Sequence, residues 1–156
     1  MLFRSGVELG GSVKNVIAIG AGIVDGLGFG TNTQAVLFAR GVAEMARLGA
    51  AMGAHRETFM GLSGLGDLAT TCLNRGSRNR SLGEALGKGG SLKALLKKTE
   101  MVVEGVDTAI STVALAKKFK VKMPITEAVH GILFKGKDPR GALKALLKGG
   151  SNRERD

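Results

Sequence analysis

The segment at residues 7–24 constrains the fold of this chain more than any other feature of its sequence. It is apolar almost throughout, with small residues between the larger aliphatic ones. A short apolar run can be a buried strand or a buried helix, and periodicity alone does not distinguish the two. The length of this run favours a helix that is packed on several sides. Its most apolar part, from Val16 to Val24, is too short to span a bilayer.

The rest of the chain shows helical patterns separated by turn residues, and alternation with a period of two does not persist anywhere. Capping residues and helix-opening prolines predict where the helices begin. The expected helices are 33–52 after Asn32 as cap, 57–61, 67–73, 78–86 after Ser77, 92–98 after Ser91, 103–119, 124–134 from Pro124, and 139–147 after Asp138. The predicted fold class is therefore all-α, with one domain at residues 1–149 and a flexible basic tail at 150–156.

Two of these helices have predicted faces. In the helix at 33–52, Arg40, Glu44 and Arg47 are expected to point away from the apolar stripe. In the helix at 103–119, the apolar face is expected to hold Val106, Ile110, Val113 and Ala114.

Residues 16–25 look at first like a dinucleotide-binding fingerprint, in which a strand is followed by G-x-G-x-x-G. Gly20 and Gly22 match the first two glycines. Asp25 stands where the third small residue belongs, and more glycines follow at once, so no helix begins there to receive a pyrophosphate. The β-α-β continuation is absent as well. We therefore interpret these glycines as part of a buried helix.

The net charge of +10 predicts an anionic ligand or surface: nucleic acid, an acidic membrane or a phosphorylated metabolite. The chain has no Trp or Tyr and no compact basic arm, which weighs against nucleic acid. The single cysteine, Cys72, cannot form an internal disulfide and is expected to be a small core residue in a reducing compartment. His55 and His130 lack metal-ligand spacing and are expected at the surface. We expect a cytoplasmic protein without membrane insertion and without a metal site.

Lys14 interrupts the apolar helix. It can extend its ammonium group to water, or it can face a polar cavity. In a partly dry cavity, desolvation would lower the pKa of this lysine and suit it to general acid–base catalysis near neutral pH. The spacing leaves both readings open, and the small Gly10 and Gly11 just before it slightly favour the cavity.

Two further polar positions are ambiguous on chemistry alone. Asp67 ends a glycine-rich turn, where it can cap the next helix or take part in a site. Residues 77–80 place two arginines and two hydrogen-bonding side chains at a helix start, where free N–H groups and the helix dipole suit a dianionic phosphate. The other reading is a capped helix with a solvated basic face.

Taken together, five segments resemble the C-terminal domain of bacterial-type NAD(P)-dependent sn-glycerol-3-phosphate dehydrogenases. They are residues 8–18, 64–72, 77–80, 103–105 and 123–129. The resemblance runs in order from Gly6 to about Leu147. It implies a multi-helical domain like the C-terminal domains of 6-phosphogluconate and glycerol-3-phosphate dehydrogenases. Such a domain binds glycerol 3-phosphate or dihydroxyacetone phosphate beneath a nicotinamide that an N-terminal Rossmann domain holds.

The resemblance also implies roles for individual residues. Lys14 would donate the proton to the ketone oxygen and accept it in the reverse direction, while Asn15, Asp67 and Thr71 would orient it and the substrate. The substrate-binding residues would be Lys14, Asp67, Ser77, Arg78 and Asn79. The residues near the cofactor would be Arg78, Val102 and Glu104.

Nothing in the sequence matches the N-terminal half of that family. We therefore expect the Rossmann domain to be missing here, NAD(P)H to bind mainly to that domain, and the chain alone to be inactive. The alternative is a non-catalytic helical module for dimerisation or for binding anions or nucleic acid. The joint presence of Lys14, Asp67 and Arg78 argues against this alternative. A homodimer is the preferred oligomeric state.

Overall fold

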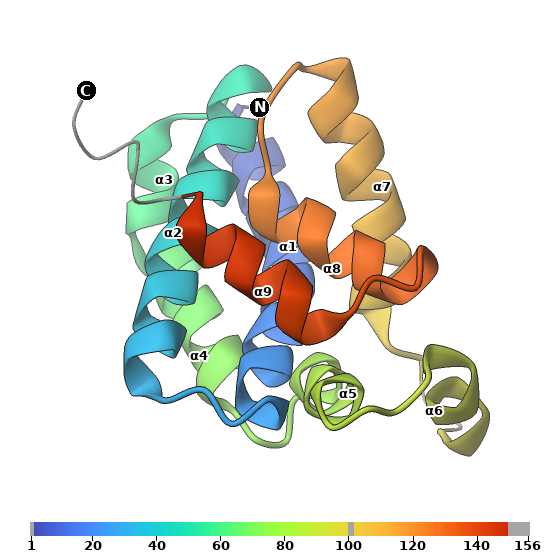
Figure 1. Ribbon diagram of the computed structural model, residues 1–156. Coiled ribbons are helices and arrows are strands. Elements are labelled where there is room, and N and C mark those ends of the chain that lie inside the picture. Colours follow the sequence, from blue (N-terminus) through green and yellow to red (C-terminus); the bar gives the residue numbers. More distant parts are fainter. Residues whose placement is uncertain (1, 100–101, 150–156) are drawn as a thin grey trace.

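The computed structural model describes residues 2–99 and 102–149, and every regular element in these ranges is helical (Figure 1). In chain order they are α1 (Leu2–Gly26), α2 (Thr31–Ala51), α3 (Arg56–Met60), the π-helical turn η1 (Leu62–Gly66), α4 (Asp67–Leu73), α5 (Arg78–Gly87), α6 (Leu92–Lys98), α7 (Glu104–Lys118), α8 (Pro124–Phe134) and α9 (Pro139–Lys148). The predicted all-α fold is confirmed. The tail predicted at 150–156 lies outside the described residues.

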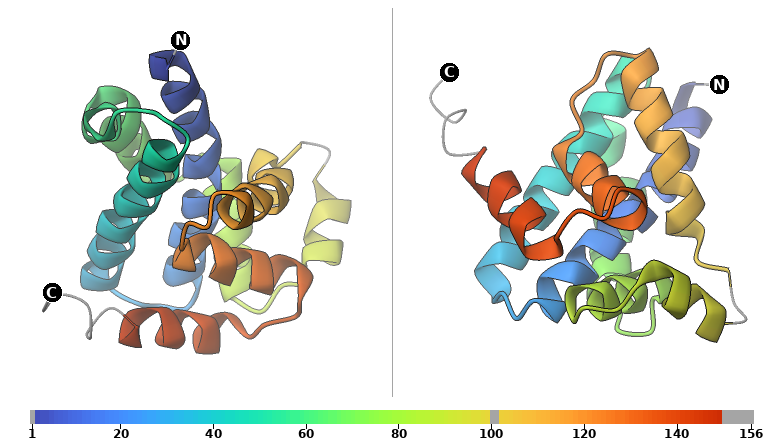
Figure 2. Two further views of the ribbon diagram at one scale, coloured as in Figure 1. Left: turned by 90° about the horizontal axis from the view of Figure 1, so that it is seen from above. Right: turned by 45° about the vertical axis from the view of Figure 1, so that its right-hand side comes forward.

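The central element is α1, as the apolar run predicts. Its side chains from Val13 to Val24 are almost all inaccessible to solvent, and α2, α4, α5, α7 and α8 all pack against it. Figure 2 shows α1 enclosed by these helices, with α9 on the outside against α8. Gly20 and Gly22 lie within this helix, so no strand–turn–helix fingerprint exists at this place.

Several predicted helix starts are confirmed together with their caps. Ser77 accepts a hydrogen bond from the backbone N–H of Arg80, and Ser91 accepts one from Ala94. Asp138 accepts one from Gly141 at 2.6 Å, and Pro124 opens α8. These starts are predictable because donor and acceptor lie within one turn of the chain.

The predicted start of α2 is wrong. The helix begins at Thr31 with Gly30 as its cap, and no side chain caps it. The carbonyl oxygen of Gly30 accepts hydrogen bonds from the N–H groups of Thr33 and Gln34. Asn32 therefore lies inside the first turn rather than before it.

Glu44 was predicted to point away from the apolar stripe, and this prediction is wrong. Its side chain is 1% exposed and its carboxylate accepts hydrogen bonds from the N–H groups of Ile125 (2.5 Å) and Thr126 (3.2 Å). The Thr126 hydroxyl donates a third. A carboxylate from α2 thus satisfies the unpaired donors at the start of α8, which sequence proximity could not indicate.

The predicted apolar face of α7 is only partly correct. Val106 is buried, but Ile110 is 50% exposed and Ala114 is exposed as well. The buried face consists of Gly105, Val106, Ala109, Thr112 and Ala116. On this face Gly105 lets α7 lie close to α1, since a Cβ atom there would lie 2.9 Å from the Asn15 carbonyl oxygen.

Candidate active site

Lys14 and Asp67 form an ion pair between α1 and the start of α4. The distance from Lys14 Nζ to Asp67 Oδ2 is 2.6 Å, and the two side chains are 22% and 40% exposed. Asp67 does not act as an N-cap, because the cap position of α4 is Gly66 and no side chain caps that helix. The carboxylate is instead directed across to the lysine of the central helix.

The π-helical turn η1 determines where Asp67 begins the next helix. A Cβ atom at Gly64 would lie 2.6 Å from the backbone carbonyl carbon of Phe59, so only glycine fits there. The hydroxyls of Thr70 and Thr71 donate to the carbonyl oxygens of Gly66 and Asp67 at 2.9 and 2.8 Å. Single π-helical turns are frequent at functional sites.

A polar pocket of about 260 Å³ is lined by most of the predicted site residues. Its lining consists of Asn15, Thr70, Thr71, Asn74, Gly76, Ser77, Arg78, Asn79 and Glu104. Lys14, Asp67 and Val102 are not among the lining residues. The ion pair is adjacent to the pocket through Asn15, the neighbour of Lys14, and through Thr71, whose hydroxyl bonds the Asp67 carbonyl.

Two buried asparagines hold the walls of this pocket together. Asn15 donates from Nδ2 to Glu104 Oε2 at 3.2 Å, and Asn79 accepts at Oδ1 from the Gly105 N–H at 2.8 Å. Each side chain is 8% exposed. Both bonds lead to the first two residues of α7, so they join α1 and α5 to the start of this helix.

The N-terminus of α5 forms the side of the pocket that is suited to bind an anion. Ser77 caps it, and Arg78 and Asn79 are its first two residues. A helix start of this kind presents free N–H groups and positive dipole character to an anion. Arg78 is an exposed side chain and can bind phosphate in a bidentate way.

Arg80 does not belong to the anion site, although the sequence suggested two arginines there. Its guanidinium forms an ion pair with Asp25 at the end of α1 and is 12% exposed. Gln34 donates to the same carboxylate at 2.6 Å. Arg78 is thus the arginine that lines the pocket.

Sequence reasoning missed three residues of the lining: Thr70, Asn74 and Gly76. Asn74 Oδ1 accepts the Gly76 N–H at 2.8 Å and so shapes the turn that precedes the Ser77 cap. The Asn-x-Gly spacing before the cap is a turn signal that could have indicated these two.

Val102 and Glu104, predicted to lie near a cofactor, differ in their placement. Glu104 is the first residue of α7 and lines the pocket, whereas Val102 is 67% exposed outside the lining.

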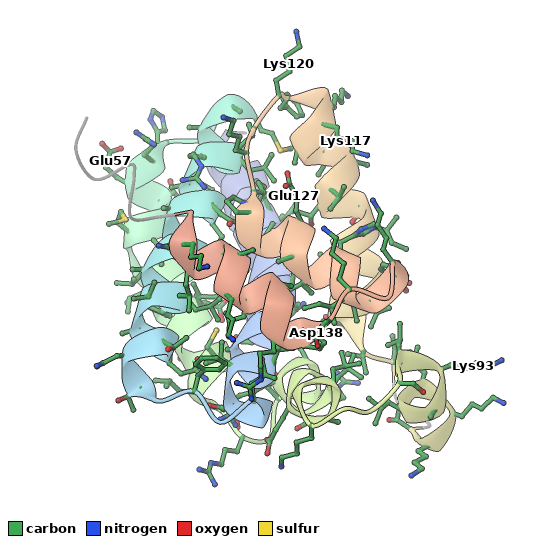
Figure 3. All side chains as sticks on the ribbon, in the orientation of Figure 1. Glu57, Lys93, Lys117, Lys120, Glu127 and Asp138 are labelled. Carbon is green, nitrogen blue, oxygen red and sulfur yellow. The ribbon has the colours of Figure 1, made fainter. Side chains whose placement is uncertain are left out.

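A larger groove of about 1080 Å³ lies between α2, the segment before α8, and α9. Its arginines are already engaged: Arg40 donates to the Leu146 carbonyl at 2.6 Å and Arg47 to that of Lys122 at 3.2 Å. Lys120 extends away from the body of the molecule (Figure 3). The smaller polar pocket, whose lining includes Arg78 and the start of α5, is the better candidate for a phosphorylated ligand.

Within residues 2–99 and 102–149, none of the helices has the length and apolar character that crossing a membrane requires. The same residues contain no group of three or more His, Cys, Asp or Glu side chains that could hold a metal ion.

Comparison with known families gives a match over most of the chain. A family model described as the C-terminus of NAD-dependent glycerol-3-phosphate dehydrogenase matches residues 4–144. Among curated proteins, the glycerol-3-phosphate dehydrogenase [NAD(P)+] of Desulfitobacterium hafniense is 53% identical over 149 residues, covering 96% of this chain and 42% of that protein. The enzyme of the same name from Thermoanaerobacter sp. is 55% identical over 142 residues, with coverages of 91% and 43%.

Solved structures agree with this match. A crystal structure of glycerol-3-phosphate dehydrogenase from Coxiella burnetii has a TM-score of 0.88 and 46% identity, and the match covers 91% of this chain and 44% of that one. A yeast glycerol-3-phosphate dehydrogenase has a TM-score of 0.74 and 28% identity, with coverages of 88% and 40%. The chain therefore spans less than half the length of the relatives it matches.

Proposed function

Because this chain belongs to the NAD-dependent glycerol-3-phosphate dehydrogenase family, as its C-terminal domain, we propose that it supplies the substrate half of an active site. The reaction is the interconversion of sn-glycerol 3-phosphate and dihydroxyacetone phosphate with NAD(P)(H). The observation that carries the proposal is the polar pocket, which combines the start of α5 with Asn15, the neighbour in sequence of the ion-paired Lys14.

Ser77, Arg78 and Asn79 bind the substrate phosphate. The charge of a phosphate dianion matches the positive end of α5 and the Arg78 guanidinium. The Asn79 amino group, which the bond to Gly105 leaves available, adds a neutral donor. The support for this assignment is the shared lining of one pocket by all three residues.

Lys14 performs the acid–base step. When dihydroxyacetone phosphate is reduced, the proton on Lys14 Nζ passes to the carbonyl oxygen at C2, and the lysine is reprotonated from solvent. In the oxidation direction, the proton returns from the hydroxyl to the lysine. Asp67 orients the ammonium group through the 2.6 Å ion pair. Thr71 and Asn15, which line the pocket, are assigned to orient Lys14 and the substrate hydroxyls.

When bound, the nicotinamide supplies or accepts the hydride at C2. Arg78, Val102 and Glu104 fit one edge of this cofactor, because Val102 and Glu104 are exposed and Glu104 borders the pocket. The described residues contain no glycine-rich turn between a strand and a helix that would cradle a pyrophosphate. The main cofactor contacts therefore belong to the part of the relatives that this chain does not span.

We also infer a cytoplasmic protein that does not bind nucleic acid. A single cysteine, buried at position 72, and the lack of Trp and Tyr support this inference. The second candidate function is a self-associating helical module, which the exposed Leu62 and Leu73 favour.

A titration of the purified chain with glycerol 3-phosphate, followed by NMR amide shifts, tests the phosphate site. Arg78→Ala should weaken binding by about tenfold or more, because a charge-assisted bidentate contact is lost. Arg75→Ala is the matched control: it removes the same charge three residues earlier, from a side chain that is exposed and outside the lining.

Equal binding by Arg78→Ala and wild type would exclude this pocket as the phosphate site. A second arm tests catalysis, by adding the N-terminal part of the Desulfitobacterium hafniense relative in trans and following NAD(P)H oxidation with dihydroxyacetone phosphate. Restored turnover is expected. Binding without any turnover in trans would favour the module.

A further inference from the structure

Two glycines of α1 meet α5 at close range: Gly22, which belongs to the rejected fingerprint, and Gly26. Each helix contributes a pair of glycines four residues apart, Gly22 and Gly26 on α1 and Gly83 and Gly87 on α5. Gly26 faces Gly87, whereas Gly22 and Gly83 each face backbone atoms of other residues on the opposite helix. A Cβ atom at Gly22 would lie 2.7 Å from the Glu84 backbone nitrogen and would overlap the Arg80 carbonyl oxygen. A Cβ at Gly83 would overlap the Ile19 carbonyl in the same way. Because the obstructing atoms are backbone, no side chain can turn aside to make room.

Contacts at this crossing follow the same order along both helices. Gly83 meets Ile19 and Ile23, and Gly87 meets Ile23 and Gly26. The N-terminal end of α5 therefore lies towards the middle of α1, near the turn that carries Lys14 and Asn15.

Gly105, at the start of α7, lies against Asn15 and Asn79, which both line the pocket. A Cβ atom there would lie 2.6 Å from Asn79 Oδ1 and 2.9 Å from the Asn15 carbonyl oxygen. The first turns of α5 and α7 are thus held against the catalytic turn of α1 with no space between them.

Polar bonds join the first turn of α5 and the helix α2 to the C-terminal end of α1. Arg80 on α5 pairs with Asp25 on α1, and Gln34 bonds both that carboxylate and the Ala21 carbonyl, at 2.6 and 2.9 Å. Glycine pairs of this spacing permit helix backbones to approach closely, and the resulting contact has few adjustable atoms.

We propose that this glycine crossing, defined as Gly22, Gly26, Gly83 and Gly87, sets the distance between the anion site at the start of α5 and the ammonium group of Lys14. The crossing thereby determines how long a phosphorylated substrate can be while reaching both groups. Gly22 and Gly83 are positioning residues that act through Asn79 and Lys14. The inference rests on the proposed function, since it assigns the two ends of one substrate to these two sites.

The test compares two ligands in two matched variants. Glycerol 3-phosphate must reach both the start of α5 and Lys14, whereas inorganic phosphate needs only the former. Gly22→Ala should weaken glycerol 3-phosphate binding about tenfold, the loss of about one good hydrogen bond, and should change phosphate binding by less than about twofold. Gly20→Ala is the control, because its Cβ would meet only side chains, of Val129, Ile125 and Leu37, at 3.5–3.7 Å.

A ligand-independent readout accompanies the titrations. Displacement of α5 should break the bond from the Gly105 N–H to Asn79, so hydrogen exchange of the Gly105 amide should become faster in Gly22→Ala and stay unchanged in Gly20→Ala. If Gly22→Ala does not fold, Gly87→Ala replaces it. Its Cβ would lie 2.6 Å from the Ile23 carbonyl oxygen, at the end of α5 that is remote from the pocket.

The outcomes separate the two hypotheses. A folded crossing variant that binds both ligands like the wild type, or that loses both equally, overturns the proposed spacing role. Unchanged exchange of the Gly105 amide overturns it as well. If the wild type binds neither ligand, the proposed function fails, and the exchange measurement still decides whether the crossing positions α5.

Discussion

Glu44 is the residue whose environment departs most from what its type and position suggest. Burial raises the pKa of its carboxyl from 4.5 to about 7. Hydrogen bonds from the backbone of Ile125 and Thr126, the Thr126 hydroxyl and the charge of Arg47 all act in the opposite direction but do not offset burial. The folded chain therefore binds a proton at Glu44 more tightly than the unfolded chain does.

The sign of the resulting pH dependence follows from this difference. Between pH 4.5 and about 7 the folded state holds more protons at Glu44 than the unfolded state, so the contribution of Glu44 to the free energy of unfolding falls as pH rises. Relative to Glu44→Gln, the free energy of unfolding of the wild type should fall by up to about 3 kcal/mol across this window. It should not fall further above pH 7. Urea denaturation of both proteins at pH 5 and pH 8 measures the change. A difference that is constant with pH would contradict the raised pKa.

At the scale of elements, the π-helical turn η1 is the segment on which the ion pair depends. Gly64→Ala should displace this turn, because its Cβ would meet the backbone of Phe59, and overpacking of this kind costs about 1–3 kcal/mol. Gly66→Ala in the same turn should be tolerated, since its Cβ would approach only the Leu62 side chain, at 3.4 Å. Chemical denaturation and glycerol 3-phosphate titration of both variants check this. If Gly64→Ala is as stable as Gly66→Ala, η1 does not constrain Asp67.

Predicted helix bounds were accurate where one turn of chain contains both partners. Ser77, Ser91 and Asp138 each cap a helix through an N–H three residues later, which the sequence displays directly. The start of α2 was missed because Gly30, the residue at its cap position, has no side chain to cap the helix, so the sequence shows no capping pattern there.

At the scale of the whole molecule, exposed apolar side chains flank the segment that carries Asp67. Leu62 is 91% exposed, Leu73 78% and Met60 61%. Apolar surface of this kind is characteristic of contact with another protein surface. We therefore expect the chain to self-associate through these side chains.

The double variant Leu62→Ser, Leu73→Ser should therefore be more monomeric than the wild type, and light scattering after size exclusion measures this. Ile110→Ser, which alters a half-exposed side chain on α7, serves as the control and should leave the mass unchanged. A wild type that is already monomeric at NMR concentrations would refute self-association.

The sequence by itself determined the all-α class, the central helix, most helix bounds and six of the nine residues that line the polar pocket. Each of these depends on local residue patterns or on short sequence motifs. Asn15, Thr71, Ser77, Arg78, Asn79 and Glu104 could be predicted together because the family resemblance preserves them in order.

Only the tertiary structure decided which polar groups are engaged elsewhere and which surfaces are covered. Arg80 pairs with Asp25, Glu44 caps a helix far along the chain, and Ile110 is turned to the outside. Gly22 and Gly83 each contact the backbone of the other helix, so the need for glycine at these positions is visible only once the two helices are packed together. Interactions between residues distant in the chain depend on how helices cross, and a crossing is fixed by packing that no local pattern encodes.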